Sequence, residues 1–274
     1  MATILLTGAS GFVGSAALTE LSKRHHVITI GRKVLSKAVN QTHYQGLFSE
    51  FEDLRQLDTH PIDAVIHLAA VTGGCLEREG IRVNVEGTRC LMRYLIDRGC
   101  AKFVLASSTA VVGFQNASFR PVQLPIPDDH PCLDRDGYGF SKYLMEEVAR
   151  YYVRQNPQID VINLRFAVVV PDDNMPPKVG VGPVGQWAVG SITMLPRGKA
   201  VQLLRLAVES PLKPGIRIMN AVSQKAWTAE PVAEVLKNWW GDSVDLSYFK
   251  KQGHAYASVF ASDKILQELG FSTD

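Results

Sequence analysis

The chain has 274 residues, of which 46% are hydrophobic and 20% are charged, a composition typical of a globular protein that can bury a sizeable core. Its 29 basic and 27 acidic residues leave a formal net charge of +2. This balance argues against partners bound by broad electrostatics, such as nucleic acid or an anionic membrane surface. Any anionic ligand must therefore be held locally.

The cysteines are scattered, without a C-x-x-C pair or a histidine at metal-ligand spacing: Cys75, Cys90, Cys100 and Cys132. They favour a reduced cytosol over a disulfide framework or a metal site. The first residues enter an apolar stretch directly, and no apolar run approaches the ~18 to 20 residues of a membrane span. We expect a cytoplasmic protein without a signal peptide, a membrane segment or a bound metal.

Short apolar runs alternate with segments of helical period along the first 170 residues. Strands are predicted at Thr3–Thr7, Val27–Ile30, Ala64–Leu68, Phe103–Ala106 and Val161–Leu164. Helices are predicted from Gly11, over Asn84–Arg98 and from Tyr138 to about Arg154. This alternation predicts βαβ units, and the continuous apolar strands are typical of a parallel sheet covered on both faces. The expected fold is a doubly wound α/β sheet of Rossmann type.

Beyond Pro171 the chain is rich in proline and glycine to about Gly185 and loses its periodicity, which predicts a boundary between a first domain of residues 1–170 and a small lobe of residues 171–274. A strand over Ile216–Ala221 and a helix capped by Thr228 and running to Trp239 are expected further on. We expect this strand and helix, near residues 214–240, to return to the first domain.

The first strand leads into the segment TGASGFVG, residues 7–14, at the start of a helix. Gly8 permits a tight turn, Gly11 lets a backbone approach a pyrophosphate, and Gly14 lets the helix pack close to the strand. Amide groups at a helix N-terminus then face the anion. Because strand, loop and helix occur in the required order, we favour a dinucleotide site over a plain turn.

The second strand ends in Gly31, Arg32 and Lys33, where an NAD enzyme usually carries an acidic residue for the ribose 2′-hydroxyl. Arg32 instead suits a 2′-phosphate through charge-assisted hydrogen bonds. The alternative is a solvated Arg–Lys pair at a strand end. We expect NADP(H), with NAD(H) left open.

Tyr138 and Lys142 are spaced Y-x-x-x-K at the start of a predicted helix, so their side chains share a face. An adjacent ammonium and a bound nicotinamide cation would favour the phenolate of a tyrosine whose ordinary pKa is near ~10. A strand ending in Ser107 and Ser108 lies about 30 positions earlier, and a hydroxyl there either orients a substrate oxygen or satisfies the strand end.

The T-G-x-x-G-x-x-G loop resembles that of the extended short-chain dehydrogenases/reductases, the NAD-dependent epimerase/dehydratase group. Residues 107–113 are similar to the family's S-S-x-x-V-Y-G, residues 67–70 to its H-x-A-A and residues 84–88 to its N-V-x-G-T. This resemblance covers nearly the whole chain. Alignment with it assigns Ser108 to the catalytic serine position, with Ser107 as the fallback.

The resemblance implies that Ser108, Tyr138 and Lys142 carry hydride chemistry at a carbonyl or alcohol carbon. It also implies a cofactor domain of residues 1–170 and a substrate-binding lobe after it. The residues then expected to bind the cofactor are Gly8, Ser10, Gly11, Phe12, Val13, Gly14, Arg32, Leu68, Ala69, Ala70, Asn84, Lys142 and Phe166. For Phe166 a core role is equally open, and for His67 a structural role is foremost.

Several positions depart from the family pattern. Leu47 stands where many relatives carry an Asp for the adenine, and Val112 replaces a frequent tyrosine beside the substrate. Residues 167–170 replace an asparagine that holds the substrate phosphate in sugar-nucleotide epimerases, which argues against a UDP-sugar. Arg197 or Lys199 offers a contact for an acidic substrate, although a solvated surface role is favoured.

The leading hypothesis is an NADP-preferring oxidoreductase acting on a small sugar-like alcohol or carbonyl substrate, with a homodimer left open. Epimerisation with a retained cofactor is the runner-up, because it uses the same first step. A cofactor-binding sensor or scaffold without catalysis is the alternative from another class, and the Ser108, Tyr138 and Lys142 set argues against it. A hydrolase has little support, since the chain has no G-x-S-x-G elbow.

Overall fold

The computed structural model describes residues 1–36, 38–114, 116, 118–184 and 188–273. Seven strands of this described part form one parallel sheet in the order β3-β2-β1-β4-β5-β6-β9. They are β1 (Thr3–Thr7), β2 (His26–Gly31), β3 (Gln41–Gln45), β4 (Ala64–His67), β5 (Lys102–Ser108), β6 (Asp160–Phe166) and β9 (Gly215–Ala221). A separate parallel pair joins β7 (Val168–Val170) and β8 (Met194–Pro196). The expected doubly wound Rossmann-type sheet is confirmed.

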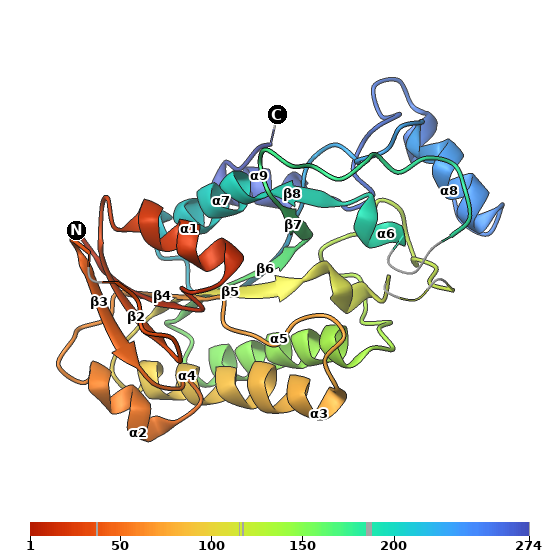
Figure 1. The fold of residues 1–274 in the computed structure, drawn as a ribbon. Coiled ribbons are helices and arrows are strands. Elements are labelled where there is room, and N and C mark those ends of the chain that lie inside the picture. Colours follow the sequence, from red (N-terminus) through yellow and green to blue (C-terminus); the bar gives the residue numbers. More distant parts are fainter. Residues whose placement is uncertain (37, 115, 117, 185–187, 274) are drawn as a thin grey trace.

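Helices cover both faces of the sheet, as Figure 1 shows. One face carries α1 (Phe12–Leu21), α7 (Arg197–Glu209) and α9 (Asp263–Leu269). The opposite face carries α2 (Phe51–Leu54), α3 (Glu77–Gly80), α4 (Gly87–Ile96) and α5 (Gly137–Gln155). The short α6 (Ala188–Ser191) and α8 (Val232–Trp240) lie away from the sheet.

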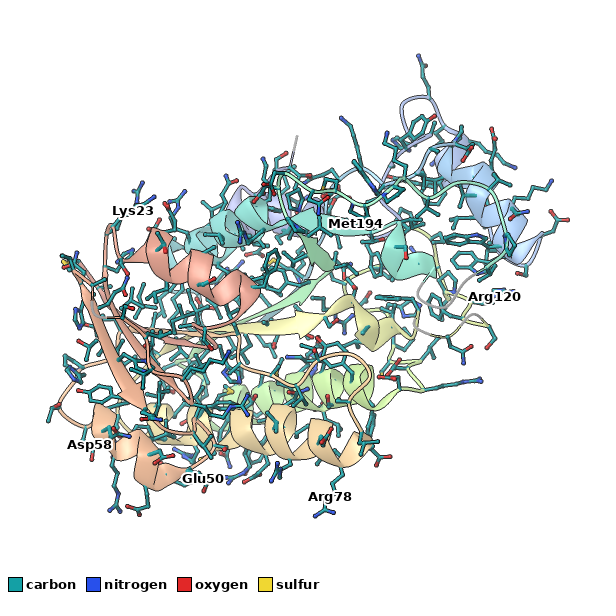
Figure 2. All side chains as sticks on the ribbon, viewed as in Figure 1. Lys23, Glu50, Asp58, Arg78, Arg120 and Met194 are labelled. Atoms are coloured by element: carbon teal, nitrogen blue, oxygen red, sulfur yellow. The ribbon has the colours of Figure 1, made fainter. Side chains whose placement is uncertain are left out.

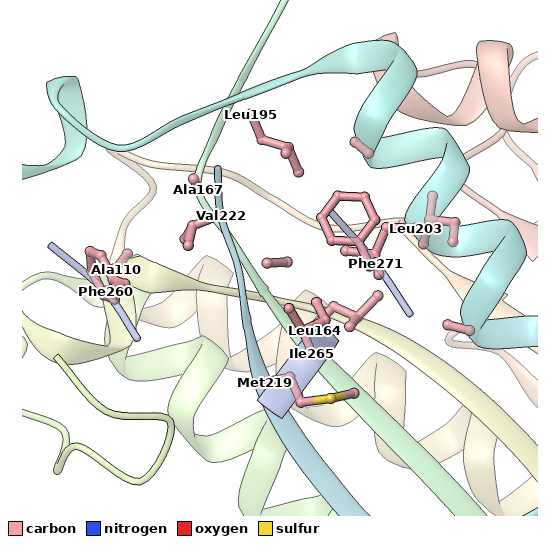
Figure 3. Packing of buried hydrophobic residues seen from close by; sticks show 14 of the residues in the cluster. Ala110, Leu164, Ala167, Leu195, Leu203, Met219, Val222, Phe260, Ile265 and Phe271 are labelled. Atoms are coloured by element: carbon pink, nitrogen blue, oxygen red, sulfur yellow. The ribbon is translucent and has the colours of Figure 1, made fainter. Parts of the chain in front are cut away.

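Alternate residues of each strand enter different cores, because successive side chains of a strand point to opposite faces. In β1, Ile4 and Leu6 belong to the core under α1 and α7, whereas Leu5 belongs to the core under α4 and α5. Figure 3 shows part of the first core, where Leu164 of β6 and Ile265 of α9 lie in one cluster. Burial on both faces explains why these strands are continuously apolar.

Polar and charged groups gather at the outside of the helices. Lys23, Glu50, Asp58 and Arg78 are exposed and stand at the periphery of the fold in Figure 2. Among the residues that the structure describes, no helix combines the length and the apolar composition needed to cross a membrane.

The direction in which strands are added reverses at β1, which pairs with β2 on one side and β4 on the other. In an open parallel sheet such a reversal leaves a crevice at the carboxyl ends of the strands, where ligands bind. The end of β1 and the start of α1 lie at this reversal. The topology therefore brings the glycine segment to the crevice.

In the C-terminal half, β9 joins the sheet beside β6, α7 and α9 cover one of its faces, and α8 lies away from the sheet. The division into a first domain of residues 1–170 and a lobe of residues 171–274 stays a prediction. Thr228 does not cap α8, because the helix begins only after Pro231, and Thr228 forms a β-bridge with Val179. Gly185, the expected end of the proline- and glycine-rich stretch, lies outside the described residues.

The helix expected over Asn84–Arg98 also begins earlier. It is continuous from α3 through a π-helical turn (Ile81–Glu86) into α4. Gly99, just beyond its last turn, has a φ of +84°. Glycine adopts that left-handed conformation without strain, and it is a common residue directly after the end of a helix.

A buried carboxylate holds the amino-terminal ends of β5, β6 and β9 together. Asp160 is fully buried and accepts two hydrogen bonds from Arg217, at 2.6 and 2.8 Å. Lys102 lies 3.4 Å away, and burial lowers the pKa of this lysine more than Asp160 raises it. Arg217 also lies 3.5 Å from Glu268, and Asp160 is the fully buried counter-charge that both cations share.

Replacing Asp160 by Asn should destabilise the fold by about 3–5 kcal/mol, because a buried ion pair broken on one side leaves an uncompensated charge. Urea unfolding monitored by circular dichroism measures this change. Glu52→Gln is the matched control, since both members of its ion pair with Arg55 are exposed, Arg55 by 64% and Glu52 by 79%, and it should cost less than about 1 kcal/mol. Equal stability of the Asp160 variant and the control would contradict this account.

Candidate functional site

The glycine segment forms a tight turn between β1 and α1. Gly8 has a φ of +75°, and a Cβ atom there would lie 2.7 Å from the Ala69 nitrogen. A Cβ on Gly14 would lie only 2.1 Å from the carbonyl oxygen of Gly8. The Gly11 N–H donates to that same carbonyl at 2.9 Å. Helix and strand thus approach so closely that side chains are excluded, and the first amides of α1 open to the crevice.

A hydrogen-bonded chain fixes the ends of β1 and β4 beside this turn. His67 is buried between Thr7, whose Oγ1 lies 2.7 Å from its Nδ1, and Thr88, whose Oγ1 lies 3.0 Å from its Nε2. The Ala69 N–H donates to Thr7 as well. Burial, with a smaller effect from the charge of Lys142, lowers the pKa of His67 to about 3. The imidazole is neutral, in keeping with the structural role favoured for it.

Next along the crevice lies the end of β2. Arg32 is exposed directly after Gly31, and nothing lies within 4 Å of where a Gly31 Cβ would stand. The amide of Leu47 donates to Asp53 at 2.7 Å. Many relatives carry an adenine-binding Asp at the position of Leu47. The backbone N–H of Leu47, which could replace that contact, is already hydrogen-bonded to Asp53.

A cavity of about 410 Å³ opens at the carboxyl ends of β4, β5 and β6. It brings together Ser108, Tyr138 and Lys142, which the sequence separates by up to 34 positions, from 108 to 142. Its described lining is Val13, Leu68, Ala70, Thr72, Gly73, Ala106, Ser107, Ser108, Thr109, Ala110, Phe114, Tyr138, Lys142, Phe166, Ala167, Val168 and Val169.

Four of the residues expected to bind the cofactor line this cavity besides Lys142, namely Val13, Leu68, Ala70 and Phe166. The others lie outside it: Gly8, Ser10, Gly11, Phe12, Gly14, Arg32, Ala69 and Asn84. A dinucleotide is long, so those at the turn and at the end of β2 remain candidates for its diphosphate and adenosine half.

Ser107 and Ser108 have different hydrogen-bond partners. Ser107 donates to the buried Glu146 at 2.6 Å. Ser108 accepts from the Ala110 N–H at 3.1 Å, and its hydroxyl is hydrogen-bonded to Tyr138. This geometry leaves Ser108 as the serine whose hydroxyl can reach an oxygen beside the tyrosine, whereas Ser107 is committed to the interior.

Tyr138 lies in the first turn of α5, where Asp136 caps the helix by accepting from its N–H at 2.8 Å. Burial raises the pKa of Tyr138, and the hydrogen bond from Ser108 opposes this only in part. Without bound ligands the phenol is therefore neutral at pH 7. That the ammonium together with a bound nicotinamide cation favours the phenolate stays a prediction. A neutral phenol is suited to donating a proton.

Lys142 follows one turn later, with its Nζ 6.0 Å from the centre of the Tyr138 ring. The ammonium donates to the carbonyl oxygen of Ala106 at 2.7 Å. Burial lowers the pKa of Lys142 to about 8, and the charge of Glu146 acts in the opposite direction. Lys142 is thus largely protonated at pH 7 and loses its charge as the pH rises through 8.

Asn84 supports the wall of the cavity from behind. Its side-chain amide accepts from the Val71 N–H at 2.9 Å and donates to the Val71 carbonyl at 3.0 Å and to Ser141 at 2.9 Å. It therefore holds the loop that carries Thr72 and Gly73 to the cavity. Direct contact between Asn84 and a cofactor stays a prediction.

Other residues lie differently from what their sequence positions indicate. Val112, expected beside the substrate, is fully buried, and Phe114 lines the cavity instead after the positive φ of +106° at Gly113. The guanidinium of Arg197 stacks on Phe12, 4.9 Å from its ring centre. Lys199 donates to the carbonyl of Ser272 at 3.2 Å. Neither cation lines the cavity.

The sequence reasoning missed Thr72, Gly73, Phe114, Val168 and Val169 as lining residues. For β7 a signal was present, because the run of valines after Phe166 is too apolar for an exposed linker. For Phe114 the glycine before it was the signal, since a positive φ redirects the chain.

Comparison with known proteins agrees with this geometry. Residues 4–179 match the model of the NAD-dependent epimerase/dehydratase family. A UDP-glucose 4-epimerase of Drosophila melanogaster is 26% identical over 228 residues, covering 74% of this chain and 59% of that protein. The chain spans about half the length of the curated relatives it matches.

Solved structures share the fold at low identity. MoeE5, determined in complex with UDP-glucuronic acid and NAD, aligns with a TM-score of 0.72 and 21% identity over 99% of this chain and 94% of its own. A mutated uronate dehydrogenase aligns with a TM-score of 0.68 and 22% identity over 100% and 87% of the two chains. With the family model matched over most of its length, this chain belongs to the NAD-dependent epimerase/dehydratase family of enzymes.

Proposed function

We propose that this protein is an NADP(H)-preferring oxidoreductase that transfers a hydride between the nicotinamide and a small, sugar-like alcohol or carbonyl substrate. The observation that carries the proposal is the meeting of Ser108, Tyr138 and Lys142 in one cavity at the carboxyl edge of the sheet, next to the glycine turn. Acid–base, orienting and electrostatic groups are thus available around one reacting carbon.

The glycine turn fits a dinucleotide, because the space where side chains of Gly8 and Gly14 would stand is taken by backbone. Gly11, Phe12 and Val13 would hold its diphosphate through their amides. Leu68, Ala70 and Phe166 would enclose the nicotinamide, which supplies or accepts the hydride when bound.

Each member of the catalytic set then has one task in the reduction of a carbonyl. Ser108 donates a hydrogen bond to the substrate oxygen and so orients the reacting carbon. Tyr138 gives its phenolic proton to that oxygen as negative charge develops on it. The ammonium of Lys142 stabilises the phenolate that this leaves. Oxidation of an alcohol runs the same proton transfer in reverse.

The lining also bears on the substrate. Among the described lining residues, the titratable side chains are Tyr138 and Lys142, both assigned to catalysis. A buried ionised group needs a charged or hydrogen-bonding partner, and Phe114, Ala167 and Val168 offer none through their side chains. This supports a small neutral substrate over one carrying a diphosphate near the reacting carbon.

Sugar or nucleotide-sugar epimerisation with a retained cofactor is the second candidate, and the names of the curated relatives favour it. It would use the same proton transfer at Tyr138. Net turnover of NADP(H) and a preparation free of tightly held nucleotide distinguish the oxidoreductase from the epimerase.

The proposal also covers the location and the assembly of the protein. The four cysteines are free, which supports a reducing, cytoplasmic compartment. A homodimer remains part of the proposal and is open to sedimentation analysis.

Replacing Tyr138 by Phe should lower kcat by about 10²- to 10⁴-fold, the usual contribution of a positioned acid–base group. The ring keeps its place in the cavity, so the dissociation constant of NADPH should change little. Steady-state kinetics and fluorescence titration measure the two quantities. Tyr143→Phe is the matched control on the same helix, because Tyr143 does not line the cavity. Full activity of the Tyr138 variant would refute its assigned role.

Replacing Arg32 by Asp should reverse the cofactor preference, because a carboxylate repels a 2′-phosphate and accepts from a 2′-hydroxyl. The ratio of kcat/KM for NADP(H) over NAD(H) should fall by at least about tenfold, a change of about 1.4 kcal/mol. Lys33→Asp makes the same charge change one residue later and should leave this ratio nearer the parent value. A parent enzyme that already prefers NAD(H) would overturn the role of Arg32.

Matched pairs of a neutral sugar and its uronic acid should show higher kcat/KM for the neutral member. An NADP(H)-linked screen over sugars, sugar acids and aldehydes measures this, run beside mass spectrometry of any co-purified nucleotide. Preference for a UDP-sugar with no net redox turnover would contradict the oxidoreductase and support the epimerase.

A further inference from the structure

A buried carboxylate stands one helical turn beyond Lys142 on α5. Glu146 has no solvent exposure and accepts three hydrogen bonds. Arg165 donates two of them, from Nε at 2.9 Å and from Nη2 at 2.8 Å. The third comes from the hydroxyl of Ser107 at 2.6 Å. The catalytic roles assigned above leave this group without a function.

The donors belong to the strands that carry the reacting groups. Ser107 directly precedes Ser108 at the end of β5, and Arg165 directly precedes Phe166 at the end of β6. Residues 107 and 165 are also paired in the register of the sheet. One carboxylate on α5 therefore joins the ends of β5 and β6 to the helix that carries Tyr138 and Lys142.

Arg165 extends the same network toward the start of α5. Its Nη1 donates to the carbonyl oxygens of Asp128 at 3.0 Å and His130 at 3.5 Å. This segment leads to Asp136, the cap of the helix. The guanidinium of Arg165 thus donates to the carboxylate of Glu146, which is its counter-charge, and to the backbone carbonyls of Asp128 and His130.

The cost of such a pair indicates that stability alone does not explain it. A buried ion pair often stabilises a fold no more than apolar side chains of the same shape would. The Met145, Ala149 and Tyr152 side chains of α5 serve that apolar purpose on the same face of the sheet. We therefore infer that the charged pair has a function that an apolar pair at this position could not perform.

The electrostatic surroundings of Lys142 supply that role. Its described neighbours with titratable groups are Tyr138 and Glu146 on α5, His67 on β4, and Cys75 in the loop before α3, with Arg165 of β6 behind Glu146. His67 is neutral and both Tyr138 and Cys75 have pKa values raised by burial. Glu146 is thus the carboxyl group among these neighbours, and its charge opposes the effect of burial on the pKa of Lys142.

We propose that Glu146 is a positioning residue that, held by Arg165 and Ser107, keeps the ammonium form of Lys142 in place at neutral pH. The inference rests on the proposed function, because it gives the charge on Lys142 a purpose in holding the cofactor and stabilising the phenolate of Tyr138. It acts through Lys142 and touches neither substrate nor cofactor.

The test is the pH dependence of two measurements, kcat/KM and the dissociation constant of NADPH, in Glu146→Gln. In the parent enzyme both should weaken as the pH rises through about 8, where Lys142 loses its proton. In E146Q this alkaline limb should move down by about one pH unit, since an opposite charge at short range shifts a pKa by that order. A purely structural role would lower activity equally at every pH.

Two further variants separate charge from packing. Ser107→Ala removes a hydrogen bond to the same carboxylate but keeps its charge, so its alkaline limb should stay with the parent. The double variant E146Q/R165M removes both members of the ion pair, which avoids an unpaired buried guanidinium and protects folding. Because this variant also removes a positive charge near Lys142, its limb should lie between that of E146Q and that of the parent. Repeating the binding titration in the Tyr138→Phe background assigns the limb to Lys142 and not to the phenol.

The outcomes are distinct from those for the proposed function. A shifted binding limb without turnover of any substrate would support the role of Glu146 and reject the oxidoreductase. Turnover with an unshifted limb in E146Q, or in the double variant where E146Q alone does not fold, would reject the role of Glu146 alone. Failure of both variants to fold would show that the pair serves structure, and this also overturns the proposal.

Discussion

The close approach of α1 to the end of β1 is the constraint on which the rest of the site depends. With backbone where the side chains of Gly8 and Gly14 would be, the helix begins directly above the strand, and its first amides face the crevice. The reversal of strand order at β1 sets the crevice at this point. A larger residue at position 14 would push the helix away from the strand and disrupt the turn, and with it the proposed anion site.

Buried polar groups then hold the surrounding strand ends in register with this turn. Thr7, His67 and Thr88 join β1, β4 and α4 on one side of the cavity. Ser107, Glu146 and Arg165 join β5, α5 and β6 on the other. In each set, polar atoms that would be costly if unpaired are satisfied by one another, which leaves Ser108 and Tyr138 at the cavity between them. The groups proposed to react are therefore positioned by networks to which they do not themselves belong.

Burial gives this cavity its chemical character. It raises the pKa of Tyr138 and lowers that of Lys142, and each change favours the neutral form of the group. The mainly apolar lining around them strengthens any charge interaction that a bound ligand brings. Small local changes in charge, such as the arrival of a cofactor or the presence of Glu146, thus have a large influence on which groups carry protons.

The sequence by itself determined the parallel sheet, the glycine turn, the spacing of Tyr138 and Lys142, and membership of the family, because these follow from local periodicity and from residue types at fixed separations. Tertiary structure alone decided that Ser107 turns to Glu146 while Ser108 meets Tyr138, since neighbouring serines have the same sequence signal. The tertiary structure also decided that Val112 is buried in the core while Phe114 lines the cavity. It decided as well that α7 and α9 cover the sheet while α8 lies away from it. The physical reason is that strand pleat, chain reversal and burial depend on contacts between residues far apart in the chain, which no local pattern records.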